Sequence, residues 1–409
     1  MTEDANSNRS LREYDAFNRP TKVTDALGRT ITYVYDNADN LIQVIDGKGN
    51  PISYSYDALH RRVSEKDALN NETKYTYDAE GNVIRRTDAN GKITSYTYNA
   101  VDELTQIRYP DGEKVSYGHD AVGNLITMSD KTGKTEYSYD SRNRLKHVLF
   151  PTKKFIEYSY DGSNLIGLNS NAGSISYNYD AANRLTKVSS GDGTTTYSYD
   201  PSGRRTKTLY PNGIEATYTY DKANRLLSLT HQSLSNPKLK LPFSSYTYDK
   251  VGNRLTLKDN EGTHTYTYDQ AYQLTSVTYP LGNKIEYVYD KAGNRLSLKE
   301  GKKTTSYAYD NANRLLKADK ITYTYDKNGN TLKEQRPNKT TTYTYDFENR
   351  LKKVQKENKI INYTYDAQGY RAAKVVNGKT THFYHEGFNL LFETDEKDKL
   401  KQSYVHGSD

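Results

Sequence analysis

Tyr246-Thr247-Tyr248-Asp249-Lys250-Val251-Gly252-Asn253-Arg254-Leu255 is the stretch of the 409-residue chain that decides the fold, because close variants of it recur along almost the whole sequence. Tyr-Asp pairs begin at Tyr14, Tyr35, Tyr56, Tyr77, Tyr139, Tyr160, Tyr179, Tyr199, Tyr220, Tyr248, Tyr268, Tyr289, Tyr309, Tyr325, Tyr345 and Tyr365. Weaker copies are Tyr98-Asn99 and His119-Asp120. The step is 21 residues up to His119 and mostly 19 to 21 afterwards. Such a fixed period indicates a tandem repeat architecture.

Each repeat is predicted to be one β-hairpin. The two tyrosines in Tyr246-Thr247-Tyr248 are two residues apart, which suits a strand with tyrosines on one face and hydroxyl groups on the other. The following aspartate begins a turn, because its carboxylate accepts a hydrogen bond from the backbone two residues on. A second short strand such as 184–188 comes next, and then a second turn such as 88–91. The predicted fold class is all-β.

The third residue after each turn aspartate is predicted to have a left-handed backbone conformation. It is Gly at Gly81, Gly123, Gly203, Gly252, Gly293, Gly329 and Gly369, and Asn at Asn18, Asn143, Asn164, Asn183, Asn224, Asn313 and Asn349. The other copies have Asp39, His60, Asp102 and Tyr272. Gly, Asn, Asp and His tolerate a positive φ, as a turn closed by a Gly-type bulge requires. For Tyr272 we expect a different turn or local strain.

The composition favours a thin sheet over a thick globular core. Hydrophobic residues make up 34% of the chain, with 41 Tyr and only 8 Phe. We expect tyrosines to stack from hairpin to hairpin, with hydroxyl partners supplied by Thr, Asn, Arg or water. The net charge of +7 is well mixed along the chain and is weak evidence for an anionic partner. The absence of cysteine excludes disulfides and thiol chemistry.

The unbroken period predicts one elongated repeat domain. Residues 1–10 are polar and are expected to be a disordered lead, 11–381 to be the hairpin repeats, and 382–409 to be degenerate terminal repeats. An insert around 230–243 is expected in a surface loop at a second turn, and the step of 16 between Tyr309 and Tyr325 is expected to clip a second strand. The sequence shows no signal peptide and no membrane-spanning segment, so we expect a cytoplasmic chain or a piece of a longer exported protein.

The motif Tyr-x-Tyr-Asp-x-x-Gly-Asn-Arg-Leu at this spacing resembles the YD repeat, or RHS repeat, over roughly residues 11–409. This repeat is known from RHS and wall-associated polymorphic toxins, from the B and C components of Tc toxins, and from the shell of teneurins. The resemblance implies one spiralling sheet that forms an open or partial hollow shell around a C-terminal toxin or effector. The self-cleaving core of the family, with its Asp-Pro-x-Gly-Leu-type motif, is not in this sequence, so no residue here inherits cleavage or toxin activity.

The favoured interpretation is therefore a non-catalytic shell of a secreted or cell-surface protein. Its partners would be a toxin or effector domain or flanking shell segments, with no cofactor, nucleic acid or membrane insertion. The residues predicted to matter are structural repeat positions: Tyr35, Asp36, Tyr77, Asp78, Gly81, Tyr199, Asp200, Gly203, Tyr248, Asp249, Gly252, Tyr289, Asp290 and Gly293. Aspartates that recur at every turn are structural rather than catalytic.

The sequence admits three other interpretations. Aromatic repeats also occur in cell-wall and carbohydrate-binding modules, which makes an adhesin-like surface repeat the alternative function. Tyrosines interleaved with arginine suit single-stranded nucleic acid, but the charge is too balanced for that. His382, His385 and Glu386, with His406 nearby, were considered as a zinc site; residues three apart on a strand face opposite sides, so no metal site is predicted.

Overall fold

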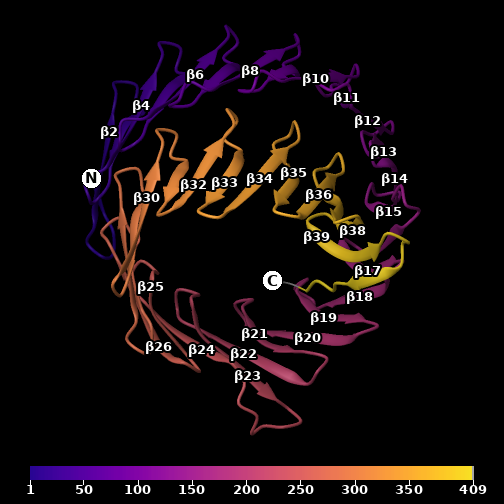
Figure 1. Ribbon diagram of the computed structural model, residues 1–409. Coiled ribbons are helices and arrows are strands. Elements are labelled where there is room, and N and C mark those ends of the chain that lie inside the picture. Colours follow the sequence, from indigo (N-terminus) through magenta and orange to yellow (C-terminus); the bar gives the residue numbers. More distant parts are fainter. Residues whose placement is uncertain (408–409) are drawn as a thin grey trace. The chain divides into compact units, whose positions relative to one another are not determined.

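The computed structural model describes residues 1–407, which consist of strands joined by short turns. These residues form forty strands, and each strand pairs antiparallel with the next one along the chain (Figure 1). The predicted all-β class is therefore confirmed. No helix among the described residues is long and apolar enough to cross a membrane.

The strands follow the repeat. The first group is β1 (Thr2–Glu3), β2 (Arg9–Tyr14), β3 (Pro20–Thr24), β4 (Thr30–Tyr35), β5 (Leu41–Ile45), β6 (Pro51–Tyr56), β7 (Arg62–Lys66), β8 (Glu72–Tyr77), β9 (Val83–Thr87), β10 (Ile93–Tyr98), β11 (Leu104–Arg108), β12 (Lys114–His119), β13 (Leu125–Asp130) and β14 (Gly133–Tyr139). The second is β15 (Leu145–Leu149), β16 (Phe155–Asp161), β17 (Asn164–Ser170), β18 (Gly173–Tyr179), β19 (Leu185–Ser190), β20 (Gly193–Tyr199), β21 (Arg205–Leu209), β22 (Ile214–Tyr220), β23 (Leu226–Ser233), β24 (Phe243–Tyr248), β25 (Arg254–Asp259), β26 (Gly262–Tyr268) and β27 (Leu274–Thr278). The third is β28 (Lys284–Tyr289), β29 (Arg295–Glu300), β30 (Lys303–Tyr309), β31 (Leu315–Ala318), β32 (Ile321–Tyr325), β33 (Thr331–Arg336), β34 (Lys339–Tyr345), β35 (Leu351–Lys356), β36 (Lys359–Tyr365), β37 (Arg371–Val376), β38 (Lys379–Glu386), β39 (Asn389–Asp395) and β40 (Leu400–Ser403).

The hairpin of β24 and β25 shows the geometry of one repeat. Tyr246 lies opposite Leu257, and the register then shifts at a β-bulge so that Tyr248 lies opposite Arg254. The turn is closed by the Gly252 N–H, which donates to the Asp249 carbonyl at 3.3 Å. Gly252 has φ of 103°. A bulge of this kind needs a left-handed residue, and glycine adopts that conformation without a steric penalty.

The left-handed conformation predicted at the third position occurs in every copy except one. At Asn164 the prediction is wrong, because Asp161 pairs with Asn164 across a shorter turn and Gly162 takes the positive φ, 56°, instead. At Tyr272 a different turn was one of two expectations, and it is wrong: the Tyr272 N–H donates to the Asp269 carbonyl at 3.0 Å as in the other copies. Tyr272 has φ of 64°, which is strained for an aromatic residue, as the other expectation held.

Contacts divide the chain into two compact units. Unit 1 comprises Met1–Tyr75, Thr87–Gly91 and Ala216–Thr340. Unit 2 comprises Thr76–Arg86, Lys92–Glu215 and Thr341–Asp409, of which Ser408 and Asp409 lie outside the described residues. The predicted terminal segment 382–409 therefore falls in unit 2, and its last two residues lie outside the described residues. Each unit combines hairpins that are far apart in the sequence.

In unit 1, second turns from the N-terminal hairpins meet Tyr-Asp turns from the later hairpins. The Asn313 side chain donates to Asp46 Oδ2 at 3.0 Å, and Lys48 lies 3.4 Å from Asp290 Oδ2. A Cβ atom added at Gly47 would overlap the backbone carbonyl of Lys291. This edge contact has no signature in the repeat motif, because it joins residues 242 to 267 positions apart.

The first ten residues belong to the same edge contact. They were expected to be a disordered lead, but Thr2–Glu3 pairs with the start of β2, and Asp4 closes the turn between them. The Asn6 side chain donates to Asp249 at 2.8 Å, and Asn8 donates to the hydroxyl of Tyr272 at 2.9 Å. The polar composition that indicated disorder is instead that of a turn with partners in later repeats.

Unit 2 has a small apolar core where the last hairpins pack on earlier ones. Ile156 in β16 and Leu168 in β17 are buried together with Tyr384, Leu391 and Phe392 from β38 and β39. The rings of Tyr384 and Phe392 stack with centroids 4.4 Å apart. The segment 389–395, which is more apolar than the other repeats, thus supplies a hydrophobic contact that the tyrosine repeats lack.

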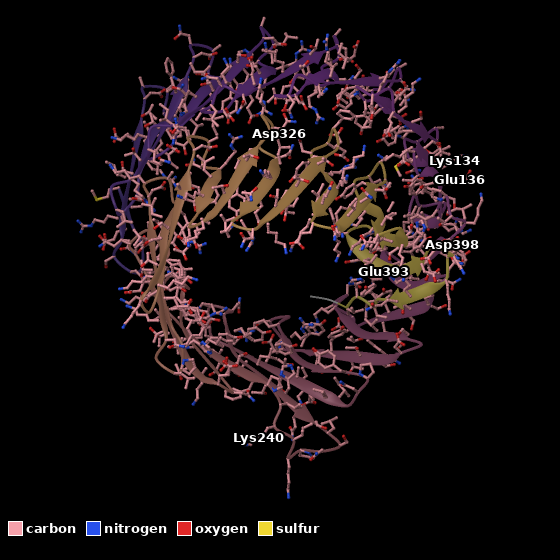
Figure 2. The ribbon with its side chains drawn as sticks, in the orientation of Figure 1. Lys134, Glu136, Lys240, Asp326, Glu393 and Asp398 are labelled. Carbon is pink, nitrogen blue, oxygen red and sulfur yellow. The ribbon has the colours of Figure 1, made fainter. Side chains whose placement is uncertain are left out.

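The two irregular steps lie where the sequence placed them. β23 ends at Ser233 and β24 begins at Phe243, so the insert forms a loop that carries the exposed Lys240 (Figure 2). The clipped copy has a four-residue strand, β31, and the Ala318 and Ile321 pair closes its short second turn. Both expectations are confirmed.

Candidate functional site

The repeated turn is the feature from which any site on this chain is built. Asp249 Oδ1 accepts hydrogen bonds from the backbone N–H groups of Gly252 and Asn253, both at 2.7 Å, and Oδ2 accepts one from the Asn253 side chain at 2.7 Å. The residue four positions after the aspartate is Asn or Arg in most copies. Where it is Arg144, its guanidinium lowers the pKa of Asp140 to about 2. Asp140 is thus held ionised by its arginine.

An arginine at that fourth position also links one repeat to the next. The Arg225 guanidinium binds Asp221 at 2.6 Å, lies over the ring of Tyr248 at 5.0 Å, and donates to the Asp249 carbonyl at 2.7 Å. Arg184, Arg314 and Arg350 make the same three contacts. A tyrosine ring covered by the guanidinium of the preceding repeat serves to join the two repeats. Such a ring has less free surface for stacking with a sugar or a nucleic-acid base.

The Tyr-Asp tyrosines donate to a backbone carbonyl in the preceding repeat. The hydroxyl of Tyr248 binds the Leu226 carbonyl at 2.7 Å, and that of Tyr289 binds the Leu274 carbonyl at 2.8 Å. The acceptor is the fifth residue after the previous aspartate, which lies beside the β-bulge. The ladder to the next strand starts two residues later, at Ser228 in β23 and at Ser276 in β27, so this carbonyl lies outside the ladder and the next tyrosine satisfies it. Side-chain or water partners were expected for these hydroxyls, and the observed partner is the backbone.

The predicted site residues occupy equivalent places in separate repeats and do not converge on one centre. Each tyrosine ends a strand, each aspartate begins the turn, and the glycines have φ of 100°, 82°, 103° and 87° at Gly81, Gly203, Gly252 and Gly293. The tyrosines and aspartates are Tyr35, Asp36, Tyr77, Asp78, Tyr199, Asp200, Tyr248, Asp249, Tyr289 and Asp290. Of the aspartates, Asp249 and Asp290 also reach other hairpins of unit 1, through Asn6 and Lys48.

The C-terminal histidines stand in for the Tyr-Asp tyrosines. His385 Nε2 binds the Arg371 carbonyl at 3.2 Å, and His406 Nε2 binds the Leu390 carbonyl at 2.7 Å. These are the bulge carbonyls of the preceding hairpins. Among residues 1–407 no group of three or more His, Cys, Asp or Glu side chains is arranged to hold a metal ion. The sequence signal for this role was the 20-residue step from Tyr365 to His385.

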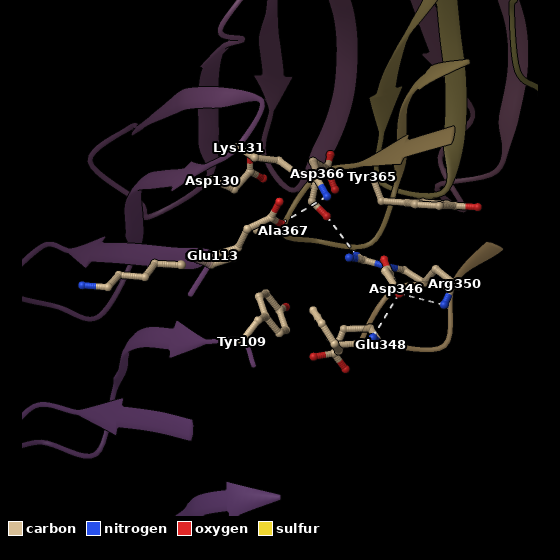
Figure 3. A pocket seen from close by; sticks show the side chains of 13 residues that line it. Tyr109, Glu113, Asp130, Lys131, Asp346, Glu348, Arg350, Tyr365, Asp366 and Ala367 are labelled. Carbon is tan, nitrogen blue, oxygen red and sulfur yellow. Dashed lines mark hydrogen bonds and ion pairs between the residues drawn. The ribbon is translucent and has the colours of Figure 1, made fainter. Parts of the chain in front are cut away.

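One turn departs from the pattern and borders a pocket in unit 2. Figure 3 shows Asp366 between Asp130 and Lys131 on one side and Arg350 on the other. Tyr370 occupies the fourth position after Asp366, where most other copies have Asn or Arg. Burial raises the pKa of Asp366 to about 6, and the charge of Asp130 adds to this effect. Asp130 Oδ2 is buried and has no hydrogen-bond partner within the described part of the chain.

Together, the strand order and the repeated turn define a protein built of tandem β-hairpins. The turn arginines and the Tyr-Asp tyrosines join one hairpin to the next. The family model described as Teneurin YD-shell matches residues 4–211 and 248–388, and the RHS Repeat model matches 199–232. The chain belongs to the Teneurin YD-shell family.

Solved structures support this assignment at the level of the fold. A crystal structure of TcdB2-TccC3-TEV matches with a TM-score of 0.68 and 16% identity, over 96% of this chain and 27% of that chain. One of TcdB2-TccC3-Cdc42 has a TM-score of 0.58 and 15% identity, over 96% and 30%. A Photorhabdus luminescens Tc holotoxin pore also has a TM-score of 0.58 and 15% identity, over 96% and 27%. The chain thus spans less than a third of each of these three chains. No curated protein sequence matches it.

Proposed function

We propose that this chain is the non-catalytic shell portion of a longer secreted or cell-surface protein of the RHS type, and that it surrounds or presents a C-terminal toxin or effector. Membership of the YD-shell family supports a structural shell role. The observation that carries the proposal is how the repeated side chains are used: the turn aspartates, arginines and tyrosines bond to their own or neighbouring repeats. Groups used in this way build a wall and leave the recognition of cargo to other residues.

The experiment is a protease-protection assay. The chain is expressed together with whatever the gene encodes after Asp409, and the downstream segment is also expressed alone. A shell predicts that the downstream segment resists a protease concentration that digests it in isolation. Equal digestion rates in the two preparations contradict encapsulation, and a reading frame that ends at Asp409 without a neighbouring toxin gene removes the cargo from the proposal.

A variant that loosens contacts between hairpins separates protection by the shell from intrinsic resistance. Gly47→Ala is suitable, because its Cβ would overlap the Lys291 carbonyl inside unit 1. If protection of the downstream segment falls in Gly47→Ala and persists in Gly191→Ala, the shell is the source of the protection. Protection that persists in both assigns it to the downstream segment itself.

A further inference from the structure

Unit 2 contains a cavity of about 310 Å³ beside the irregular Asp366 turn. One wall comes from β14 to β16 and the loop after β15, and the other from the Asp366 turn with β37 and β38. Both walls are parts of the same unit. The cavity is at the small end of the range for ligand sites, which is about 300 to 1,000 Å³.

The cavity lies beside a turn that lacks the usual side-chain donor at the fourth position. In the copies with arginine there, the guanidinium binds the turn aspartate and stacks on the next aromatic ring, as Arg350 does with Asp346 and Tyr365. In the Asp366 copy this position is Tyr370, whose ring stacks on His385 with centroids 5.4 Å apart. The stacking contact is therefore kept while the charge is lost. Asp366 retains the backbone bond from Tyr370 N–H at 2.9 Å but has no guanidinium or amide from the fourth position.

The polar groups left over at this cavity accept hydrogen bonds. His385 donates through Nε2 to the Arg371 carbonyl, so Nδ1 carries a lone pair, and Nδ1 is buried without a partner in the part of the chain that the structure describes. Burial lowers the pKa of His385, which keeps the ring neutral and Nδ1 an acceptor at neutral pH. Asp366 and Glu386 add carboxylates to the same lining.

The rest of the lining is aromatic. Tyr137, Phe150, Tyr158, Tyr370 and Phe383 all border the cavity. Burial raises the pKa of Tyr137 and Tyr158, with further increases from the carboxylates of Asp366 and Glu386 respectively. Aromatic faces together with carboxylates attract a cation that carries an apolar body.

We propose that this cavity binds a small organic ammonium ion, with its charged nitrogen at Asp366 in the place that other repeats give to an arginine guanidinium. The ammonium N–H groups donate to the Asp366 carboxylate and to His385 Nδ1, and the apolar body lies among the aromatic rings. A ligand of about ten non-hydrogen atoms suits a cavity of this size. This inference does not depend on whether the chain encloses a toxin.

The test is isothermal titration calorimetry of the full chain with 2-phenylethylammonium, using neutral 2-phenylethanol as the shape-matched control ligand. We expect the ammonium to bind at least about tenfold more tightly than the alcohol, because it forms charge-assisted hydrogen bonds. Equal affinities, or no heat of binding from the ammonium, overturn the proposal and leave a cavity that holds only water.

Two substitutions locate the charge. Asp366→Asn keeps an acceptor for the Tyr370 N–H but removes the carboxylate, and we expect a loss of affinity of about tenfold or more. Asp269→Asn is the matched control, because Asp269 begins an equivalent turn in unit 1 and has Gln273 at its fourth position. Tyr370→Arg restores the usual residue, and its own guanidinium should exclude the ligand. An unchanged affinity in Asp366→Asn, or an equal loss in Asp269→Asn, contradicts the assignment.

The pH dependence gives an independent check. The titratable or charged groups around Asp366 are Glu113, Lys114, Asp130, Lys131, Asp346, Glu348 and Arg350 on the pocket side, and His385 and Glu386 on the cavity side. Burial raises the pKa of Asp366 to about 6, so the ligand must displace a proton at lower pH. We expect affinity to fall by about tenfold between pH 7 and pH 5 in the parent chain. A parent profile as flat as that of Asp366→Asn refutes a role for this carboxylate.

Discussion

Replacing Gly47 by alanine is expected to loosen unit 1 although the backbone conformation at Gly47 suits any residue. Its φ lies outside the left-handed region, so the substitution brings no backbone strain. The added Cβ would instead overlap the backbone carbonyl of Lys291, which, unlike the end of a flexible side chain, cannot move aside without moving its turn. The two turns must therefore separate.

The magnitude follows from what separation breaks. Overpacking of a fixed contact costs about 1 to 3 kcal/mol. The hydrogen bond between Asn313 and Asp46 and the half-buried ion pair between Lys48 and Asp290 lie at the same contact. They contribute about 1 kcal/mol and at most about 1 kcal/mol respectively. We expect a local loss of about 1 to 4 kcal/mol in the opening free energy of the hairpins that meet there.

Hydrogen exchange measured by mass spectrometry is the suitable assay, because repeat proteins open locally. Peptides from 41–56 and 284–295 should exchange at least about fivefold faster in Gly47→Ala, since each 1.4 kcal/mol is about a factor of ten. The matched control is Gly191→Ala, whose Cβ would meet no atom within 4 Å and which also lacks a positive φ. Equal exchange in the two variants would refute the edge contact between the turns of Gly47 and Lys291.

Three further outcomes are expected. Tyr289→Phe leaves the Leu274 carbonyl without its donor and should lower the local opening free energy measured by hydrogen exchange by about 1 to 3 kcal/mol. The control Tyr14→Phe, at a half-exposed tyrosine, should lower it by less than about 0.5 kcal/mol. Similar losses in the two variants would contradict the role of the hydroxyl. Gly252→Val should cost about 1 to 3 kcal/mol through strain at φ of 103° alone, because the nearest side-chain atom is 3.9 Å away, and unchanged thermal unfolding would refute that turn. For Asp366 the folded-state pKa of about 6 lies above the ordinary value, so this group stabilises the chain below about pH 4, and about 3 kcal/mol of that contribution is lost as the pH rises to about 6. In denaturant unfolding, Asp366→Asn should remove this dependence of the unfolding free energy on pH. An unchanged dependence would assign the titration to another group.

The sequence predicted the local geometry of the repeat because the information is local. The alternation in Tyr246-Thr247-Tyr248 is visible within one copy, and the period is visible from one copy to the next. The small set of residue types at the third position indicates the left-handed turn directly. The failure at Asn164 has the same local origin: Gly162, two positions earlier, offers a shorter turn that takes the positive φ instead. The choice between the two depends on strand pairing, which residue types at one position do not report.

Contacts between distant hairpins could not be predicted in this way. The overlap of Gly47 with Lys291 and the hydrogen bond from Asn6 to Asp249 join residues more than 240 positions apart, and nothing in the motif specifies which turns meet. The partner of the tyrosine hydroxyls was also missed. A side-chain inventory suggests Thr, Asn or Arg, whereas the acceptor is a backbone carbonyl that lies before the first pair of the ladder to the next strand.

The shortest and longest steps show which part of the repeat holds neighbouring hairpins together. Across the 16-residue step, the Arg314 guanidinium lies 5.0 Å from the Tyr325 ring, and the Tyr325 hydroxyl binds the Leu315 carbonyl at 2.7 Å. Across the 28-residue step the corresponding distances, from Arg225 to Tyr248 and from Tyr248 to the Leu226 carbonyl, are also 5.0 Å and 2.7 Å. A change of twelve residues in the intervening chain thus leaves the link unaltered, because the added length lies in the second turn and in the strands beside it, β23 having eight residues and β31 four. The Tyr-Asp turn sets the spacing between hairpins, while the second turn is free to vary in length and sequence, and it is this freer turn that meets other hairpins at the edge of unit 1.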